Sequence, residues 1–562
     1  MIPGKFYLCF MTNHDIADHF ELLSKLMDIH GADSFRAKSY ASAAFRIEKV
    51  PEPLAELNVE QLKALPAIGP SLAKKIEELN VSGKLSALED YLEKTPKGVV
   101  EMLNIKGIGP KKIALLWQDL GIESIGELEY ACQENRLVTL KGFGAKTQAS
   151  ILASIQFIKA NSGFCLYAEA DMMVQQLLDF FATNYPEAHY SPAGAFRMQR
   201  NVLDSIDWVC TLNKEAIIAA FVHLPFERTE GEDTLSIKLE GLPPINFRLA
   251  ANETAFFIQL FKSSSSADFT QAFEADYNYP ENLNNEQDIF TQHQLAYVAP
   301  ALRESPSTLQ LAAANKLPEL IQPGDIKGII HSHSTYSDGQ HSLEQMAKAA
   351  KEKGYEYLVI SDHSQAAFYA NGLSPERIAL QHIEIDKLNQ KLAPFKILKS
   401  IEADILNDGR LDYEDTVLNS FDLVIASVHS NLKMTEEKAM QRILAAIQHP
   451  ATGILGHPTG RLLLSRAGYP VDHKTLIDAC VAHNVVIEIN AHPRRLDLDW
   501  TWIEYALSQG ALLSINPDAH SMDGMDLVKY GVLSAQKGGL TKERNLSSFS
   551  LAEMEAFIAQ KK

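Results

Sequence analysis

Cysteine is scarce in this sequence, and no two cysteines have the spacing of a metal ribbon or a redox pair. The chain contains five cysteines, none of them in a CxxC motif, at Cys9, Cys132, Cys165, Cys210 and Cys480. An odd number of scattered cysteines is typical of reduced thiols in an intracellular protein and argues against a disulfide framework. We therefore expect a cytoplasmic location.

Long apolar runs are absent as well. No stretch approaches the roughly 20 apolar residues that a membrane-spanning helix needs, so we expect no membrane partner. The first ten residues, MIPGKFYLCF, are too short for a signal peptide and lack a small-residue cleavage site. Translation could begin at Met1 or at Met11.

Positive charge is also in short supply. The 52 Lys and Arg residues face 71 Asp and Glu residues, and the net charge of −19 excludes a protein that coats nucleic acid along its whole length. Residues 1–165 carry a net charge of −1, residues 166–320 carry −12 and the remainder carries −6. The N-terminal third is therefore the better candidate for contact with a phosphate backbone.

A glycine-rich pattern occurs three times in residues 12–165, where apolar residues recur at helical spacing. The copies are LPAIGP at 65–70, IKGIGP at 105–110 and LKGFG at 140–144. Glycine permits close approach, and free N–H groups at a helix start can bind phosphate without reading bases. Plain helix connections are the alternative. The segments resemble helix-hairpin-helix DNA-binding motifs, which gives these candidate DNA contacts: Gly69, Lys74, Lys75, Gly107, Gly109, Lys111, Lys112, Gly142, Gly144 and Lys146.

Two regions with different predicted secondary structure follow the glycine-rich segments. Residues 166–320 mix helical stretches with predicted strands at 207–212, 216–222 and 245–249, and with predicted loops at 263–266 and 278–287. After a predicted linker at 322–325, short apolar strands alternate with amphipathic helices. Seven strands are expected, beginning at Lys327, Tyr357, Lys396, Leu423, Thr452, Val485 and Leu512. This rhythm predicts a parallel barrel related to the (βα)₈ type.

Metal-binding residue types stand at the ends of these predicted strands. Because strand ends converge on one mouth of a parallel barrel, we expect the side chains to meet there. The mixture of imidazole and carboxylate suits Zn²⁺, Mn²⁺ or Fe²⁺, and the number of ligands suits two or three ions. The candidate ligands, which we also expect to be catalytic, are His331, His333, Asp338, His363, Glu402, His429, His457, Asp518 and His520.

This set resembles the nine-ligand signature of the polymerase and histidinol phosphatase (PHP) family, and all nine positions are filled. The resemblance implies a metal-dependent phosphoesterase. Arg461, Arg494 and Arg495 are expected on loops beyond strand ends, where they could bind phosphate or be ordinary surface arginines.

With hairpins in front and this barrel behind, the chain resembles bacterial family-X DNA polymerases with a C-terminal PHP domain. SFRAKSY at 34–40 and APALRE at 299–304 resemble the start of the family's 8-kDa domain and the end of its thumb. The resemblance implies a multidomain α and α/β fold: helical helix-hairpin-helix domains, an α+β nucleotidyltransferase-like palm and thumb, and a distorted (βα)₇ PHP barrel. The expected domains are 1–95 (8-kDa-like), 96–165 (fingers-like), 166–320 (palm and thumb) and 321–562 (PHP).

The palm departs from the family's pattern of a Gly-Ser pair and three metal-binding aspartates. The corresponding positions read Gly194, Ser205, Asp207 and Asn246, so one carboxylate remains of three. Asp204 cannot replace Ser205 in an unbulged strand, because residues 204 and 207 point to opposite faces. Mg²⁺ binding in the palm is therefore in doubt, and we expect polymerase activity to be lost.

Lys75 aligns with a lysine that some family members use as a Schiff-base nucleophile. Phosphate contact is the favoured interpretation here, because Lys74 and Lys75 lie at the start of a hairpin's helix.

The leading hypothesis is a DNA-binding 3′–5′ exonuclease of DNA repair, with abasic-site endonuclease or 3′-phosphatase activity as variants. It would use Mn²⁺ or Zn²⁺, with Fe²⁺ as a further option, and act as a nucleoid-associated monomer on gapped, nicked or 3′-end DNA beside repair proteins. The alternatives are an active gap-filling polymerase with an exonuclease domain, a non-catalytic DNA scaffold, and a phosphatase for a small phosphomonoester.

Overall fold

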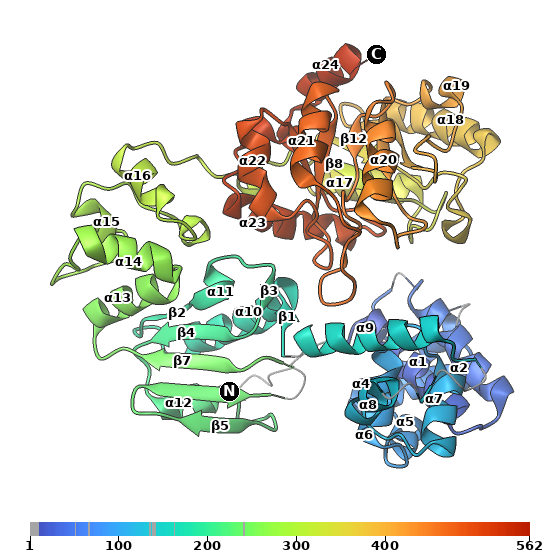
Figure 1. Ribbon diagram of the computed structural model, residues 1–562, viewed down its shortest axis with the longest axis horizontal. Coiled ribbons are helices and arrows are strands. Elements are labelled where there is room, and N and C mark those ends of the chain that lie inside the picture. The colour runs from blue at the N-terminus through green and yellow to red at the C-terminus, as the bar shows by residue number, and fades with distance from the viewer. Residues whose placement is uncertain are drawn as a thin grey trace. The chain divides into compact units, whose positions relative to one another are not determined.

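The computed structural model describes residues 11–50, 52–65, 68–133, 136–137, 142–161, 163–239 and 242–561. The chain forms two compact units, residues 1–162 and 163–562. The first unit is helical, and the second contains a mixed sheet and a seven-stranded parallel sheet (Figure 1). Met1, Cys9, Pro66, Ala67, Leu140 and Lys141, which the sequence analysis singled out or placed in its hairpins, lie outside the described residues.

The helices of the first unit begin where capping residues stand in the sequence. Thr12 and Asp15 form a reciprocal capping box at the start of α1, and Asn58 and Gln61 do the same at α3. The elements of this unit are α1 (Asn13–Ile29), α2 (Ser34–Ile47), η1 (Leu54–Glu56), α3 (Val59–Ala64), α4 (Pro70–Ser82), α5 (Ser86–Leu92), α6 (Lys97–Glu101), η2 (Met102–Asn104), α7 (Pro110–Ala114), η3 (Leu115–Asp119), α8 (Ile125–Gln133) and α9 (Ala145–Asn161).

One hydrophobic cluster runs through this unit from Ile16 to Ile155. It joins the helices on both sides of residue 95, because Leu26 and Leu88 belong to the same buried set as Ile113. A division at residue 95 therefore stays a prediction.

The second unit begins with the predicted palm, whose sheet has the strand order β2-β4-β7-β6-β5. In this sheet β4 and β7 are parallel neighbours, and the register places Asp207 directly beside Asn246. The elements of this part are β1 (Cys165–Leu166), α10 (Tyr167–Asn184), β2 (Tyr190–Pro192), α11 (Gly194–Arg197), β3 (Val202–Leu203), β4 (Ile206–Cys210), α12 (Lys214–Ala219), β5 (Glu227–Glu230), β6 (Thr234–Lys238) and β7 (Ile245–Leu249).

The predicted strand at 216–222 is wrong, because this segment contains most of helix α12. The Asn213 side chain accepts a hydrogen bond of 2.9 Å from the backbone N–H of Ala216 and so caps the helix. The cap outweighs the β-branched isoleucines, whose preference for strands is weak.

Short helices follow the sheet and form a separate aromatic core around Phe261, Phe273 and Phe290. The predicted serine loop at 263–266 ends one helix and caps the next, and residues 278–287 form a loop as predicted. The helices are α13 (Glu253–Ser263), α14 (Ala267–Asp276), α15 (Asp288–Thr291), η4 (Pro300–Leu302) and α16 (Ser307–Ala313). The predicted linker forms the 3₁₀ turn η5 (Pro323–Asp325).

The last part of the chain forms the predicted parallel barrel, and all seven strands lie where the sequence places them. Their order, β14-β13-β12-β11-β10-β9-β8, follows the sequence. The strands are almost wholly buried, since apolar residues cover both faces. They are β8 (Gly328–Ser332), β9 (Tyr357–Ile360), β10 (Lys396–Asp404), β11 (Leu423–Ser427), β12 (Ile454–Leu455), β13 (Val486–Asn490) and β14 (Leu513–Asn516).

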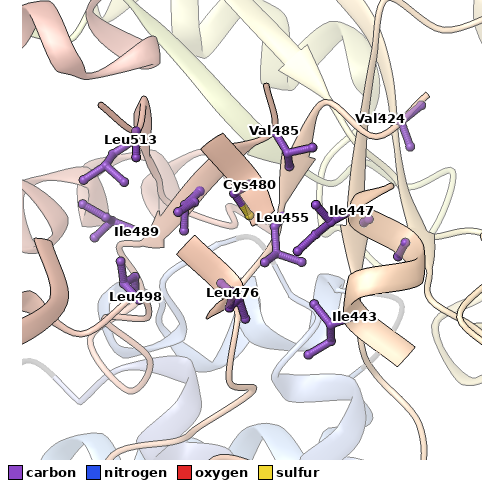
Figure 2. Packing of buried hydrophobic residues seen from close by; sticks show 14 of the residues in the cluster. Val424, Ile443, Ile447, Leu455, Leu476, Cys480, Val485, Ile489, Leu498 and Leu513 are labelled. Carbon is purple, nitrogen blue, oxygen red and sulfur yellow. The ribbon is translucent and has the colours of Figure 1, made fainter. Parts of the chain in front are cut away.

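Helices cover the outside of these strands (Figure 1). Figure 2 shows Ile443 and Ile447 of one helix, and Leu476 and Cys480 of the next, around Leu455 of β12. The elements are α17 (Leu343–Glu352), η6 (Phe368–Ala370), α18 (Pro375–Leu392), α19 (Asp415–Leu418), α20 (Glu436–Ile447), α21 (His473–Ala482), η7 (Trp500–Trp502), α22 (Ile503–Ser508), η8 (Asp523–Leu527), α23 (Val528–Lys537), η9 (Lys542–Arg544), η10 (Leu546–Ser548) and α24 (Leu551–Lys561).

A seam closes the barrel between its first and last strands. No ladder joins β8 to β14 among the described residues, and a single bridge pairs Ser332 with Ala519 instead. Ala519 accepts a hydrogen bond from His333 N at 2.8 Å and donates one to His331 O at 3.1 Å. The barrel is thus nearly closed, and its seam lies beside predicted metal ligands.

Helix α23 of the barrel packs against the palm. The ammonium group of Lys537, whose side chain is fully buried, donates to the carbonyl oxygen of Met198 at 2.9 Å and to the carboxylate of Glu304. Gln199 donates to Gln536 at 2.8 Å nearby. The palm and the barrel therefore belong to one compact unit.

Candidate metal centre

The nine predicted ligands lie together at the carboxyl ends of the barrel strands, with Glu402 of β10 at their centre. Glu402 Oε1 lies 3.0 Å from the Nε2 atoms of both His429 and His457, and 3.3 Å from His331 Nε2. Its other oxygen, Oε2, lies 2.9 Å from His363 Nδ1 and 3.8 Å from His333 Nε2. One buried carboxylate thus faces five imidazole rings.

The remaining three ligands are carboxylates and an imidazole on the far side of His333. His333 Nε2 lies 3.1 Å from Asp518 Oδ1, and His333 Nδ1 lies 3.8 Å from Asp338 Oδ1. His520 Nε2 lies 3.5 Å from Asp338 Oδ1, and its ring stacks on His333 with 4.2 Å between centroids. Residues from both ends of the barrel sequence therefore share one cluster.

Three groups of these side chains bring donor atoms within 4.8 Å of one another. His333 belongs to two groups and His363 belongs to two, so neighbouring ions would share ligands. The groups are His333, Asp338, His363 and His520; His331, His333 and Asp518; and His363, Glu402 and His429.

Unsatisfied polar atoms show that the cluster suits cations. The buried atoms His331 Nε2 and His363 Nδ1 lie near Glu402 without hydrogen-bond geometry, and His333 Nδ1 and His457 Nδ1 have no hydrogen-bond partner. Buried polar atoms are rarely left unpaired without a functional reason. Imidazole and carboxylate donors in this arrangement fit divalent transition metals.

The backbone is strained at three of the ligands. His331, His457 and Asp518 have positive φ angles of 64°, 24° and 53°. Such conformations cost about 1–3 kcal/mol per residue and concentrate at functional sites. At these three ligands, the strained backbone sets the direction in which each donor side chain points.

The electrostatics of the cluster keep its carboxylates ionised. Burial opposes the charged form of Glu402, but the surrounding imidazoles, above all His429 and His331, hold its pKa well below the ordinary value. Burial and the neighbouring His520 and His363 lower the pKa of His333 to about 3, so this ring is neutral. Burial also opposes the charge on His429, yet Glu402 raises its pKa to about 10. Because ionised carboxylates and neutral imidazoles are the forms that bind metals, His333 is ready to bind an ion, whereas His429 would have to release a proton.

Two buried carboxylates outside the nine predicted ligands orient these rings. Glu488 of β13 accepts a hydrogen bond from His331 Nδ1 at 2.7 Å, and Asp404 of β10 accepts one from His429 Nδ1 at 2.7 Å. Each bond turns the Nε2 atom of the ring toward Glu402, as supporting carboxylates do in metal sites. The available signal was a charged residue within an otherwise apolar strand, VVIEI, which predicts a paired or functional group.

The three predicted phosphate-binding arginines differ in how many protein groups already bind their guanidinium groups. Arg461 donates to the carbonyl oxygens of Arg495, at 2.8 Å, and Leu496, and pairs with Asp499 at 2.5 Å. Its guanidinium group therefore holds the neighbouring loop, and phosphate binding by Arg461 stays a prediction. Arg495 lies at the mouth, 3.7 Å from Asp518, whereas half-exposed Arg494 lies 3.9 Å from Glu169 of α10.

The palm positions form a hydrogen-bonded network around one carboxylate. Asp207 accepts from Ser205 Oγ at 3.0 Å and from Asn246 Nδ2 at 2.9 Å, and Asn246 Oδ1 accepts from Ser236 Oγ at 2.8 Å. Gly194 has φ 58°, and a Cβ there would overlap the carboxylate of Asp207. Ser205 and Asn246 are therefore hydrogen-bond donors to the single carboxylate of this network.

The palm network lines an open cavity of about 570 Å³ between β4, β7, β6 and the end of β5. Exposed Asp204 and its neighbour Ser205 both lie before β4, so the predicted comparison of strand faces does not apply to either residue.

The predicted hairpins begin helices as the sequence indicates. Gly69 and Gly109 are extended residues before Pro70 of α4 and Pro110 of α7. Gly107 has φ 98°, a conformation that other residues rarely adopt. The hairpin glycines 69, 107, 109, 142 and 144 are exposed, as are Lys74, Lys111 and Lys146. Lys75 and Lys112 are half-buried and lie 6.0 Å from the ring of Tyr40 and 5.3 Å from the ring of Phe143.

Comparisons with known proteins agree with this architecture. Family models match residues 11–85 as a helix-hairpin-helix domain, residues 99–156 as a SAM-like helix-hairpin-helix tandem and residues 330–492 as a PHP domain. The chain is 32% identical to the DNA polymerase/3′-5′ exonuclease PolX of Bacillus subtilis over 98% of its own length and 99% of that protein. This chain belongs to the PolX family.

Other relatives match a smaller share of the chain. A probable phosphatase of Caldanaerobacter subterraneus is 29% identical over 28% of this chain and 60% of its own length. A probable phosphatase of Thermoanaerobacter is 23% identical over 41% of this chain and 94% of its own length. The PolX architecture expected from the sequence is confirmed, including the helix-hairpin-helix segments and the barrel.

Within the described part of this PolX-family chain, no helix is long and apolar enough to cross a membrane.

Proposed function

We propose that this PolX-family protein is a metal-dependent 3′–5′ exonuclease of DNA repair whose palm no longer transfers nucleotides. The observation that carries the proposal is the cluster at the barrel mouth, where eight of the nine predicted ligands form three groups of donor atoms and His457 lies 3.0 Å from Glu402. Two or three Mn²⁺ or Zn²⁺ ions, or Fe²⁺, would be held by His331, His333, Asp338, His363, Glu402, His429, His457, Asp518 and His520. The substrate would be a gapped, nicked or free 3′ end, and abasic-site cleavage or 3′-phosphate removal would use the same centre.

The side chains of the mouth have separable tasks in this mechanism. When bound, divalent ions neutralise phosphate charge and acidify water. Glu488 and Asp404 hold the Nδ1 protons of His331 and His429, which keeps the Nε2 atoms available as donors. Arg495 is positioned to bind a phosphate oxygen of the strand. The exposed hairpin lysines 74, 111 and 146 would hold the backbone of the DNA without reading its sequence.

The experiment uses a gapped primer–template with a 5′ label, Mn²⁺, and all four nucleotides added or omitted. We expect the primer to shorten in both cases. Replacing both His333 and Asp518 by alanine should lower the rate by more than about 100-fold, because loss of a supporting group alone costs about 10–100-fold. Full activity in that double variant would contradict the proposal.

A matched histidine–aspartate pair provides the control. His449 Nε2 lies 3.2 Å from Asp415 Oδ1 in the same barrel, outside the ligand groups. Replacement of His449 and Asp415 by alanine should leave the rate of shortening unchanged.

The competing function is gap filling, because the relative from Bacillus subtilis is named a DNA polymerase. Lengthening of the primer on nucleotide addition, abolished by Asp207→Ala, would show that the palm is still active. Against this stands the network in which Ser205 and Asn246 donate hydrogen bonds to Asp207. Donors in these positions cannot supply the anionic oxygens that Mg²⁺ prefers.

Restoring the carboxylates gives an independent test of the palm. In the double variant Ser205→Asp/Asn246→Asp, three carboxylates would repel one another without metal and bind Mg²⁺ together. We expect Mg²⁺ to raise the thermal midpoint of this variant and to leave that of the parent chain unchanged. An equal Mg²⁺-dependent rise in the parent would show that the palm site is intact.

A further inference from the structure

Two aromatic side chains project into solvent beside the metal centre. Phe368 and Tyr369 lie on η6, which follows the ligand His363 in the chain, and they are 87% and 62% exposed. Their rings are 6.1 Å apart between centroids and meet edge to face. Neither side chain belongs to the predicted metal site, and their exposure costs free energy unless a ligand covers them.

The loop that carries these rings is firmly held. Arg377 of α18 donates to the carbonyl oxygens of Asn371, at 2.8 Å, Gly372, at 3.2 Å, and Tyr336. At the other end of the loop, the backbone N–H of Ala366 donates to Asp412 at 2.5 Å. A rigid loop that exposes aromatic faces binds without a large ordering cost.

The position of the rings relates them to the reacting end of a substrate. The centroid of the Tyr369 ring lies 6.3 Å from that of His363, which belongs to two of the three ligand groups. Successive stacked nucleotides of one strand are about 3.4 Å apart. A phosphodiester at the metal centre would therefore place the nearest bases within reach of Tyr369 and Phe368.

We propose that Phe368 and Tyr369 form a stacking platform for the unpaired bases at the 3′ end of a DNA strand. This inference rests on the proposed exonuclease function and adds the requirement that the terminal bases leave the duplex. Every base offers a π face, so stacking on aromatic side chains tolerates any sequence. Such tolerance suits an enzyme that removes nucleotides one after another.

The test compares two ligands that differ only in their bases. One is a short single strand whose last two nucleotides carry bases, with 2-aminopurine at the next position inward. The other replaces those last two nucleosides by abasic tetrahydrofuran units. Phosphorothioate linkages slow cleavage, and 2-aminopurine fluorescence reports binding to the full-length, metal-loaded protein.

We expect the parent protein to bind the base-containing strand more tightly than the abasic strand. Replacing Phe368 and Tyr369 by alanine should weaken binding of the base-containing strand about 5- to 150-fold for each stacked base that is lost. In that variant the two ligands should bind with nearly equal affinity. An equal loss for both ligands, or no loss for either, would overturn the proposal.

Two further variants separate stacking from apolar contact. Phe368→Leu/Tyr369→Leu keeps apolar surface without a π face and should behave like the alanine variant. Phe368→Trp/Tyr369→Trp keeps aromatic faces and should retain the preference for bases. A leucine variant that binds like the parent would overturn the stacking role.

The outcome is independent of hydrolysis. If the protein does not shorten DNA but still prefers the base-containing strand through these rings, the proposed function fails and the platform stands. If it shortens DNA and the alanine variant shows no change in base preference, the platform fails and the proposed function stands.

Discussion

Glu488 is a buried carboxylate whose effect on the metal centre is indirect. It is fully buried, and it accepts hydrogen bonds from His331 Nδ1 at 2.7 Å, Asn516 Nδ2 at 2.8 Å and Asn490 Nδ2 at 3.0 Å. The imidazoles of His331 and His457 keep its pKa low despite burial. Its charge and its orientation are therefore both fixed by neighbours.

We predict that Glu488→Gln lowers the affinity for Mn²⁺ or Zn²⁺ by about 10- to 100-fold, because an amide cannot hold the Nδ1 proton of His331 in the same way. To measure the change in affinity, the metal is titrated into the metal-free protein in the presence of a competing chelator. Glu384→Gln, which replaces a carboxylate of α18 that accepts a hydrogen bond from the Tyr336 hydroxyl, serves as the control and should not change metal affinity. Equal affinities of Glu488→Gln and the parent would contradict the role.

Glu286 is a second buried carboxylate, located in the aromatic core after the palm. It accepts from Arg197 Nη1 at 2.7 Å, from Arg303 Nη1 at 2.8 Å and from the hydroxyl group of Tyr297 at 2.9 Å. Burial alone would raise its pKa, but the two guanidinium groups hold the pKa far below the ordinary value of 4.5. The folded protein therefore stabilises the ionised form.

This shift fixes the sign of a pH dependence. A depressed pKa contributes stability that is complete above the ordinary carboxyl pKa and is lost as the pH falls below it. We predict that Glu286→Gln lowers the free energy of unfolding by about 3–5 kcal/mol at pH 7, because the arginines lose their partner. The difference from the parent should shrink as the pH falls from 6 toward 3, as measured by thermal midpoints.

An exposed carboxylate in the same region provides the comparison. Glu274 pairs with Lys262 at 2.8 Å, and both side chains are nearly half-exposed. Glu274→Gln should cost no more than about 1 kcal/mol, since surface pairs contribute little. A pH-independent difference for Glu286→Gln would show that its charge is not responsible.

At the scale of elements, each hairpin turns the chain directly before a helix begins. In the second hairpin, Gly107 with φ 98° turns the chain and Pro110 begins α7, which leaves exposed Lys111 in its first turn. Lysine contacts with phosphate displace counterions, so their number sets the salt dependence of DNA binding.

We predict that Lys111→Gln lowers the slope of log affinity against log salt by about 1 for gapped DNA. Fluorescence anisotropy at several salt concentrations measures the slope. Lys25→Gln is the control, because Lys25 pairs with Glu21 on α1 at 2.9 Å. Parallel lines for Lys111→Gln and the parent would show that this lysine does not contact phosphate.

The barrel strands and helix α12 differ in how far the sequence predicts them. All seven barrel strands could be predicted, because each is a short apolar run followed by a polar residue at the mouth, as in His331 and Glu402. The segment 216–222 could not, because one capping bond from Asn213 decides its structure. The sequence also does not reveal which side chains Glu488, Asp404 and Arg461 contact. These contacts join segments that are distant along the chain, and residue spacing does not report them.

At the scale of the whole molecule, the barrel is held against the palm by buried polar groups. Fully buried Lys537 contacts Glu304 and the carbonyl of Met198, while Trp500 lies 4.5 Å from its ammonium group. Lys529 pairs with Asp171 across the same boundary at 2.9 Å, but its side chain is half-exposed. These two lysines differ in burial and therefore in their expected energetic weight.

We predict that Lys537→Ala destabilises the association of palm and barrel, with a cost of about 1.5–3 kcal/mol for each charged hydrogen bond that is lost. Calorimetry should show the unfolding of residues 163–562 broaden or divide into two steps. Lys529→Ala, which removes the exposed pair, should cost about 1 kcal/mol or less. A single unchanged transition for Lys537→Ala would contradict this role.

The metal site lies across the seam of the barrel, so bound ions would also join its first and last strands. His333 and Asp518 face each other across it at 3.1 Å although 185 residues separate them in the chain. Ions bound to both His333 and Asp518 would link the two ends of the long chain segment between them. Bringing these ends together carries an entropic cost, which the binding energy of the ions offsets. Loss of the ions would then weaken the join between the first and last strands as well as remove the cutting chemistry, and the backbone bridge of Ser332 and Ala519 would hold the seam alone.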